Sequence, residues 1–304
     1  MSANEGAANE AVAELLVHSK CELGEGATWC ARSGRLYWVD ITNKRLARYD
    51  TRDGKLMTWD MPERVACFAL CEDERTLLLG LASRLAFFDL ETGEIETIVE
   101  VEPGVPTRLN DGRCDRQGRF VFGTKYEGTP RQAIGGFYRL NRDLTLERLP
   151  LPAPAISNSI AFSPDGATMY YCDSPTREIR ACDYGADGTI ANERTFATLA
   201  DETGVPDGST VDAEGGLWNA QWAGGRVVRY GPDGVETGRV KIPTAQPSCV
   251  TLGGALLDTL YVTSAREEME EEALAREPHA GGVFALRIGR QGLEEPRFQG
   301  RRRV

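Results

Sequence analysis

The sequence predicts an all-β fold, a six-bladed β-propeller in a single domain, and two features of the chain predict it. A short apolar run, a polar turn and a second apolar run recur six times along the 304 residues, at intervals of about 45 residues. Each copy is followed by a further strand-like run and a turn. Short strands grouped in a repeat of this length are typical of one propeller blade. The propeller is expected to occupy residues 11–297 and to leave no second domain.

The repeated phrase predicts the two inner strands of each blade. Apolar runs on both sides of a polar turn, which usually contains glycine, indicate an antiparallel hairpin. The six copies are ATWCARSGRLYW (27–38), FALCEDERTLLL (68–79), GRCDRQGRFVF (112–122), IAFSPDGATMYY (160–171), TVDAEGGLWNA (210–220) and CVTLGGALLDTLYV (249–262).

A third strand follows each hairpin, and turns such as Asp53-Gly54 and Asp187-Gly188 then lead to a short outer strand. The alternative to a propeller is a β-sandwich in which this repetition is accidental. The six third strands are RLARYD (45–50), RLAFFDL (84–90), GFYRL (136–140), EIRACDY (178–184), RVVRYG (226–231) and GVFALRI (282–288).

The segments outside the repeats have their own expected roles. The run VAELLVHS (12–19) is expected to pair with the last blade, which would close the ring and hide exposed strand edges. The charged, helix-favouring insertion at 266–278 is expected to be a solvated surface loop, with a lid over the channel as the alternative. Residues 1–10 and 298–304 are expected to be disordered tails.

Composition excludes several classes of partner. With 35 basic and 46 acidic residues the net charge is −11, which disfavours binding to nucleic acid or to anionic membranes. No apolar run approaches the length of a membrane helix, and the N-terminus is not expected to be a signal peptide, because its first basic residue is Lys20. The eight scattered cysteines, without a C-x-x-C pair, indicate reduced thiols. We therefore expect a cytoplasmic protein, a monomer or weak homo-oligomer, with a small-molecule partner.

The chain contains only two histidines, His18 and His279. Nucleophilic mechanisms of the Ser-His-Asp or Cys-His type therefore have almost no candidates. If the protein is an enzyme, carboxylates, amides or a metal ion must provide its catalytic groups.

Polar side chains occupy one register position in four of the six repeats, ten or eleven residues before the equivalent apolar residues Leu36, Phe120, Met169 and Leu217. In a propeller, equivalent positions of the innermost strands converge on the central channel. Two carboxylates and two amide oxygens are therefore expected at one mouth of the channel: Glu25, Asn110, Asn158 and Asp207.

A bound divalent cation would relieve the repulsion between these carboxylates. All-oxygen ligands suit Ca²⁺, Mg²⁺ or Mn²⁺; Fe²⁺ and Zn²⁺ stay open, although no His or Cys favours zinc. The alternative is that the Asp111-Gly112 and Asp207-Gly208 pairs only form turns. Nearby Arg108 and Glu127 are, by themselves, more typical of solvated charges.

Four runs of the chain resemble the senescence-marker/regucalcin/gluconolactonase family of six-bladed propellers. They are LGEGATW (23–29), RLNDGRCDRQGRFVFGT (108–124), SNSIAFSPDGATMYYCDS (157–174) and VPDGSTVDAEGGLWNAQWAGGRVVRY (205–230). The resemblance covers roughly residues 14–290. It implies one divalent cation held by Glu25, Asn158 and Asp207, with substrate contacts from Arg108, Asn110 and Glu127.

The same resemblance implies hydrolysis of a sugar lactone to the aldonic acid. Asp207 is then expected to activate water as a base or to orient it. The chain departs from the family pattern at Ser159, where glycine is usual, and at Ala27, where proline is common. Two alternatives stay open: a phosphotriester or aryl-ester hydrolase on the same propeller, and a cation-binding propeller without enzymatic activity.

Overall fold

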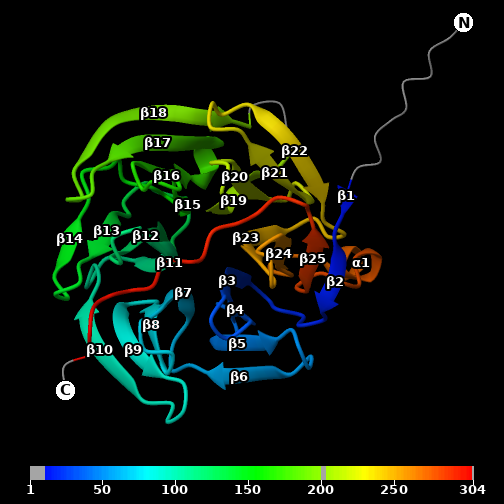
Figure 1. Cartoon of the computed structure of the whole chain (residues 1–304), viewed down its shortest axis with the longest axis horizontal. Helices are drawn as coiled ribbons and strands as arrows, with labels where there is room; N and C mark the ends of the chain where they lie inside the picture. Colours follow the sequence, from blue (N-terminus) through cyan, green and yellow to red (C-terminus); the bar gives the residue numbers. More distant parts are fainter. Residues whose placement is uncertain (1–10, 200–202, 303–304) are drawn as a thin grey trace, which may run out of the picture.

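The computed structural model describes residues 11–199 and 203–302, and it confirms the predicted propeller. Six antiparallel sheets are arranged in a ring, with the first strand of each blade innermost (Figure 1). In each sheet the chain runs outwards from the centre, strand by strand, and then passes to the next blade.

All six repeats form sheets at the predicted places. Blade one contains β3 (Gly24–Cys30), β4 (Arg35–Asp40), β5 (Arg45–Asp50) and β6 (Leu56–Asp60). Blade two contains β7 (Val65–Leu70), β8 (Thr76–Leu81), β9 (Arg84–Asp89) and β10 (Ile95–Glu100). Blade three contains β11 (Thr107–Cys114), β12 (Phe120–Tyr126), β13 (Phe137–Leu140) and β14 (Leu146–Arg148).

The second half of the ring repeats this order. Blade four contains β15 (Ser157–Phe162), β16 (Thr168–Asp173), β17 (Glu178–Tyr184) and β18 (Ile190–Thr198). Blade five contains β19 (Val205–Val211), β20 (Leu217–Trp222), β21 (Arg226–Tyr230) and β22 (Glu236–Lys241). Blade six contains β23 (Pro247–Gly253), β24 (Thr259–Ser264) and β25 (Val283–Arg287).

The N-terminal segment supplies the missing outer strand of blade six. β2 (Glu14–Val17) pairs antiparallel with β25, so the predicted closure of the ring is confirmed. The two-residue β1 (Ala11–Val12) also pairs parallel with β22 of blade five, a contact that the repeat pattern does not predict. One short segment therefore joins two neighbouring blades and covers the edges of both.

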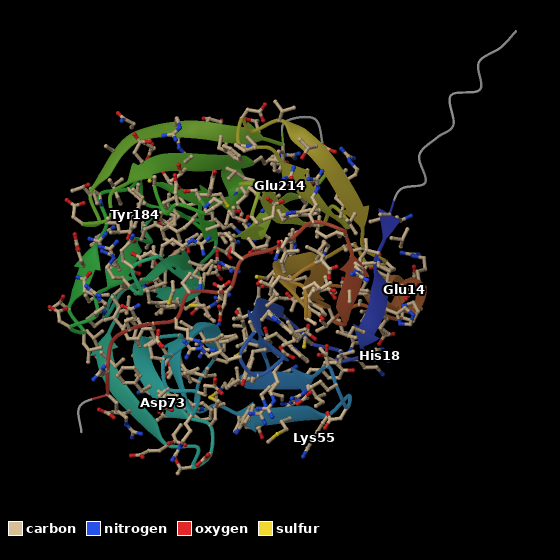
Figure 2. All side chains as sticks on the ribbon, viewed as in Figure 1. Glu14, His18, Lys55, Asp73, Tyr184 and Glu214 are labelled. Carbon is tan, nitrogen blue, oxygen red and sulfur yellow. The ribbon has the colours of Figure 1, made fainter. Side chains whose placement is uncertain are left out.

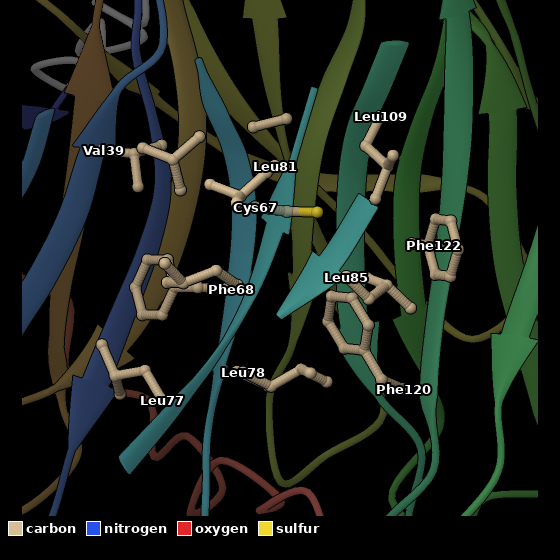
Figure 3. Close-up of a cluster of buried hydrophobic side chains, with 14 of the residues drawn as sticks. Val39, Cys67, Phe68, Leu77, Leu78, Leu81, Leu85, Leu109, Phe120 and Phe122 are labelled. Carbon is tan, nitrogen blue, oxygen red and sulfur yellow. The ribbon is translucent and has the colours of Figure 1, made fainter. Parts of the chain in front are cut away.

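The core lies between the blades, where the faces of neighbouring sheets meet. Phe120 and Phe122 of β12 pack with Leu85 of β9 and Leu109 of β11 in the largest hydrophobic cluster (Figure 3). The outermost strands differ, because β6 alternates between exposed and half-buried positions. This difference explains why inner strands read as apolar runs and outer strands as alternating ones.

A break in register occurs at the same place in every blade. Each inner strand shifts against the second strand within its first residues, between positions 25 and 28, 65 and 67, 109 and 112, 158 and 161, 206 and 209, and 247 and 250. Bulges of this kind bend a strand and redirect side chains. They coincide with the four polar positions that the sequence places at the channel mouth.

The expectation of a disordered C-terminal tail is wrong for residues 298–302. The chain after β25 crosses the middle of the ring (Figure 1), and Phe298 is fully buried beside Phe87. Phe298 N–H donates to the carbonyl of Leu70, and Arg297 donates to the carbonyl of Cys71. We call residues 289–302 the C-terminal strap. It closes the end of the channel opposite the inner-strand bulges.

The insertion after β24 contains one short helix, α1 (Glu271–Arg276), with no buried residue. The other expected tails, residues 1–10 and 303–304, lie outside the described residues. Within residues 11–199 and 203–302, no helix has the length and apolar character needed to cross a membrane. The eight cysteines are all buried and unpaired, as expected for reduced thiols.

Candidate active site

A cavity at the bulged end of the channel contains five of the six predicted site residues. It is lined by Glu25, Arg108, Asn110, Asn158 and Asp207, which come from four different blades. Four of them, Arg108, Asn110, Asn158 and Asp207, are no more than 9% exposed. The propeller thus brings together side chains that are up to 182 positions apart in the chain. The sixth predicted residue, Glu127, lies at the rim outside this cavity.

Hydrogen bonds to the backbone carbonyl of Asp207 hold this residue in place, and they leave one oxygen of its carboxylate without a partner among the described residues. Its carbonyl accepts hydrogen bonds from Asn219 Nδ2 at 2.9 Å and from Ser159 Oγ at 2.6 Å. Its Oδ1 atom is buried and has no hydrogen-bond partner within the described structure. A buried carboxylate oxygen without a partner is costly, which indicates a place for a positively charged ligand.

Ser159, where the chain departs from the family pattern, is part of this support. Its φ of +60° lies in the left-handed region that favours glycine. The hydrogen bond from its hydroxyl to Asp207 offsets that strain and links blade four to blade five. The departure therefore leaves the site intact.

Burial raises the proton affinity of both carboxylates of the cavity. Burial raises the pKa of Glu25 well above its ordinary value, and the charge of Asp207 raises it further. Burial likewise raises the pKa of Asp207, with Asp111 adding to the effect and Lys125 opposing it. Two buried carboxylates in one cavity therefore need either protons or a cation.

Two asparagines connect blades three and four beside these carboxylates. Asn110 Nδ2 donates to Asn158 Oδ1 at 3.0 Å and to the Ser157 carbonyl at 2.8 Å. Asn158 Nδ2 donates to Ser174 Oγ at 2.9 Å, and that hydroxyl donates to the Pro206 carbonyl. This chain fixes the amide orientation and turns Asn158 Oδ1 towards blade three.

Arg108 is oriented by partners on both sides. Its Nη1 atom donates to Asn110 Oδ1 at 2.7 Å, and its Nε atom lies 3.7 Å from Glu127 Oε1. Glu127 in turn accepts two hydrogen bonds from Arg64, at 2.5 and 2.7 Å. The hydrogen bonds from Arg64 lower the pKa of Glu127 and keep it ionised. Arg108 and Glu127 are therefore an organised pair rather than independent solvated charges.

These residues fit a divalent cation. Among the residues with described positions, no three His, Cys, Asp or Glu side chains form a metal site, so a cation bound by Glu25 and Asp207 needs a further ligand of another kind. Asn158 Oδ1 is the candidate because Asn158 lines the same cavity, and the orphaned oxygen of Asp207 is free to bind. Such an all-oxygen set matches the preference of hard cations such as Ca²⁺ and Mg²⁺.

Several cavity residues were not predicted from the sequence. Lys125 was detectable, since it lies near the end of β12, two residues before Glu127, and strand alternation carried one residue past the strand places both on one face. The others lie at or next to strand ends, in a short 3-10 helix or in loops, and the repeat of polar residues at one register does not identify them. They are Leu23, Arg131, Ile156, Ser174, Pro175, Val205, Trp222, Glu267 and Glu268, with Arg64 at the rim.

The insertion at 266–278 contributes to this cavity at its first residues only. Glu267 and Glu268 line the cavity, and the N–H groups of Arg266 and Glu267 both donate to the Glu22 carbonyl. Thr42 donates to Glu267 Oε1 at 3.2 Å. Helix α1 itself has no buried residue. The segment is therefore a surface insertion whose base forms one wall of the cavity.

A six-bladed propeller with a buried acidic and amide cluster at the mouth of its channel defines the class of this protein. The chain matches the SMP-30/Gluconolactonase/LRE-like region over residues 23–266 and belongs to that family. The resemblance inferred from the four sequence runs is thereby confirmed.

Individual relatives cover nearly the whole chain. An L-arabinolactonase of Azospirillum brasilense is 61% identical over 289 residues, which is 95% of this chain and 96% of the relative. A 6-deoxy-6-sulfogluconolactonase of Pseudomonas putida is 38% identical and covers 94% of this chain and 98% of its own length. The expected enzyme class, a hydrolase of lactone esters, is the class of these two relatives.

Solved structures agree on the fold. The crystal structure of a calcium-binding protein, regucalcin, from Agrobacterium tumefaciens superposes with a TM-score of 0.89 at 30% identity. The match covers 95% of this chain and 97% of that protein. This protein and that regucalcin therefore share one fold over nearly their whole length.

Proposed function

We propose that this protein hydrolyses a sugar lactone to the corresponding aldonic acid, using a divalent cation held by Glu25, Asn158 and Asp207. The observation that carries the proposal is the buried Oδ1 atom of Asp207, which has no hydrogen-bond partner in the described structure and belongs to a residue lining a polar cavity. When bound, the cation supplies positive charge that stabilises the oxygen charge developing as water attacks the carbonyl.

The chain's own residues do the remaining work. Asp207 positions the attacking water and takes one of its protons, while the other hydrogen stays on the new carboxyl group. Asn110 and Arg108 face the same cavity and offer donors and acceptors to the sugar hydroxyls. Glu127 holds the outer side of Arg108 and is available to a hydroxyl at the rim.

A pentonolactone is the substrate class we favour, and L-arabinonolactone is the first member to test. The 61% identity with an L-arabinolactonase over nearly the full length supports this choice. The polar and charged cavity wall suits a polyol ring. It gives less support to an aryl phosphotriester, which needs a more apolar pocket.

We also propose a cytoplasmic location and a monomer or weak homo-oligomer without nucleic-acid or membrane partners. Eight buried, unpaired cysteines support a reducing compartment, and the net charge of −11 opposes binding to phosphate backbones.

The deciding experiment follows acid release from L-arabinonolactone, xylonolactone and gluconolactone at constant pH, with spontaneous hydrolysis subtracted. The protein is first stripped of metal and then reloaded separately with Ca²⁺, Mg²⁺, Mn²⁺, Fe²⁺ or Zn²⁺. We expect cation-dependent turnover that is fastest with a pentonolactone. Cation binding without turnover of any lactone would instead establish the non-enzymatic alternative, and turnover of paraoxon alone the phosphotriesterase alternative.

A further inference from the structure

Lys125 lies in the wall of the cavity, on the same side as the groups proposed to bind the substrate. Its position on β12 is paired with Arg108 of β11. The cavity that it lines also contains Asp207 of β19 and Glu267 from the insertion after β24. The positive charge of Lys125 lowers the pKa of Asp207, against the larger effect of burial.

The ammonium group of Lys125 is a free donor. Among the described residues the structure gives it no hydrogen bond and no ion pair. The neighbouring guanidinium groups differ, because Arg108 donates to Asn110 and to its neighbour's carbonyl, while Arg64 is paired with Glu127. Holding an unpaired cation half-buried costs free energy, and burial together with Arg108 lowers the pKa of Lys125.

Opening a sugar lactone creates a need for such a donor. Once water has added to the carbonyl, the ring C–O bond must break, and its electron pair goes to a sugar oxygen. That oxygen leaves as an alkoxide, which is strongly basic, so proton donation at this point accelerates bond breaking. Neither Asp207, which takes a proton from water, nor the engaged Arg108 is free to supply it.

We propose that Lys125 is a further catalytic residue, which donates its proton to the ring oxygen as the lactone opens. This inference rests on the proposed function. In the balanced step, one water hydrogen goes to Asp207 and hydroxide adds to the carbonyl carbon. The ring C–O bond then breaks, and the leaving oxygen takes a proton from Lys125 Nζ. The new carboxylic acid returns a proton to Lys125, and Asp207 releases its proton to solvent.

The charged groups that face Lys125 are consistent with this role. Arg108 of β11 and Arg131 after β12 favour release of its proton, whereas Glu267 and Asp207 favour the charged form before catalysis. Glu127, two residues further along the chain, is committed to Arg64. The ammonium therefore faces both a group that keeps it charged and a cavity where a substrate oxygen can receive its proton.

The test compares Lys125→Met, which keeps the length of the side chain, with Lys125→Arg and with the control Lys55→Met. Lys55 is exposed at the outer rim of the ring (Figure 2). Each variant is assayed in the cation-loaded form on L-arabinonolactone and on dihydrocoumarin, an aryl lactone whose phenolate leaves without a proton. Thermal unfolding of each variant checks the fold.

We expect Lys125→Met to reduce kcat/KM on the sugar lactone by about 10²-fold, the usual scale for loss of a general acid. Its effect on dihydrocoumarin should be several times smaller, and its melting temperature should not fall. Lys125→Arg, whose guanidinium keeps a positive charge but does not release its proton, should not recover the activity on the sugar lactone. Equal losses on both substrates would indicate a structural role and overturn the proposal, as would a fully active Lys125→Met variant.

If the wild-type protein does not hydrolyse dihydrocoumarin, a second measurement tests the proposal with the sugar lactone alone. Hydrolysis of the sugar lactone in ¹⁸O-labelled water reports how often the tetrahedral adduct returns to lactone. Without a proton for the leaving oxygen, Lys125→Met should place more label in unreacted lactone per turnover than the wild type does. Unchanged labelling would reject the inference. Failure of the wild type to open any sugar lactone would reject the proposed function instead.

Discussion

At the scale of single residues, the site depends on side chains that are oriented by neighbours from other blades. Asn219 and Ser159 hold the backbone of Asp207, and its carboxylate Oδ1 atom has no hydrogen-bond partner among the described residues. Arg64 and Glu127 do the same for Arg108 from outside the cavity. These supporting contacts predict which substitutions act on chemistry and which act on substrate positioning.

Replacement of Asp207 by asparagine should remove the proton acceptor and weaken the cation site while keeping the shape of the side chain. We expect kcat to fall by about 10²-fold or more, as for loss of a general base. The backbone hydrogen bonds to Asp207 do not involve its carboxylate, so the fold should survive. Steady-state kinetics and circular dichroism check this; a kcat near the wild-type value would remove Asp207 from the mechanism.

Arg64→Ala should act on substrate binding. The Arg64–Glu127 pair is about one-third exposed, and such pairs contribute at most about 1 kcal/mol, so KM should rise up to about fivefold with kcat nearly unchanged. Arg32→Ala breaks an exposed ion pair with Glu72 and serves as the control, with no change in KM. A loss confined to kcat would contradict the positioning role of Arg64.

At the scale of elements, two features place the site and close the channel behind it. A bulge near the start of each inner strand turns the polar side chains to the cavity. The C-terminal strap covers the other end, where Arg113 forms an ion pair with Glu295 at 2.6 Å and Phe298 is fully buried. Apolar burial of this kind contributes to stability far from the chemistry.

Phe298→Ala should therefore destabilise the fold. Removing a fully buried phenylalanine side chain typically costs about 3–5 kcal/mol, because a cavity is left behind. Urea unfolding measures the loss. Leu256→Ala, at a side chain that is 62% exposed, is the matched control and should change stability by no more than about 0.5 kcal/mol. Equal stability of the two variants would show that the strap does not contribute.

At the scale of the whole molecule, the closed ring brings residues that are far apart in the sequence close together at its centre. Glu25 and Asp207 belong to the first and fifth blades, yet the charge of Asp207 raises the pKa of Glu25. A cation between them would therefore stabilise the closed ring as a whole, since it binds only when the blades are assembled.

Metal stripping should lower the melting temperature. At a free cation concentration 100-fold above Kd, binding contributes about 2.7 kcal/mol, which corresponds to a shift of roughly 5 °C for a chain of this size. Calorimetry before and after chelation measures the shift, and Glu25→Gln should abolish it. An identical melting curve with and without every cation tested would refute an occupied site.

The sequence by itself determined the number of blades, their strands and the shared register of Glu25, Asn110, Asn158 and Asp207, because these follow from a period in one dimension. Closure by residues 14–17 was also predictable, since an incomplete last repeat needs a strand from elsewhere. Only the tertiary structure decided that Phe298 is a core residue and that Arg64 and Glu267 lie at the site. These residues belong to no repeated position, so their proximity arises from the folding of loops and termini onto the ring, which no spacing encodes.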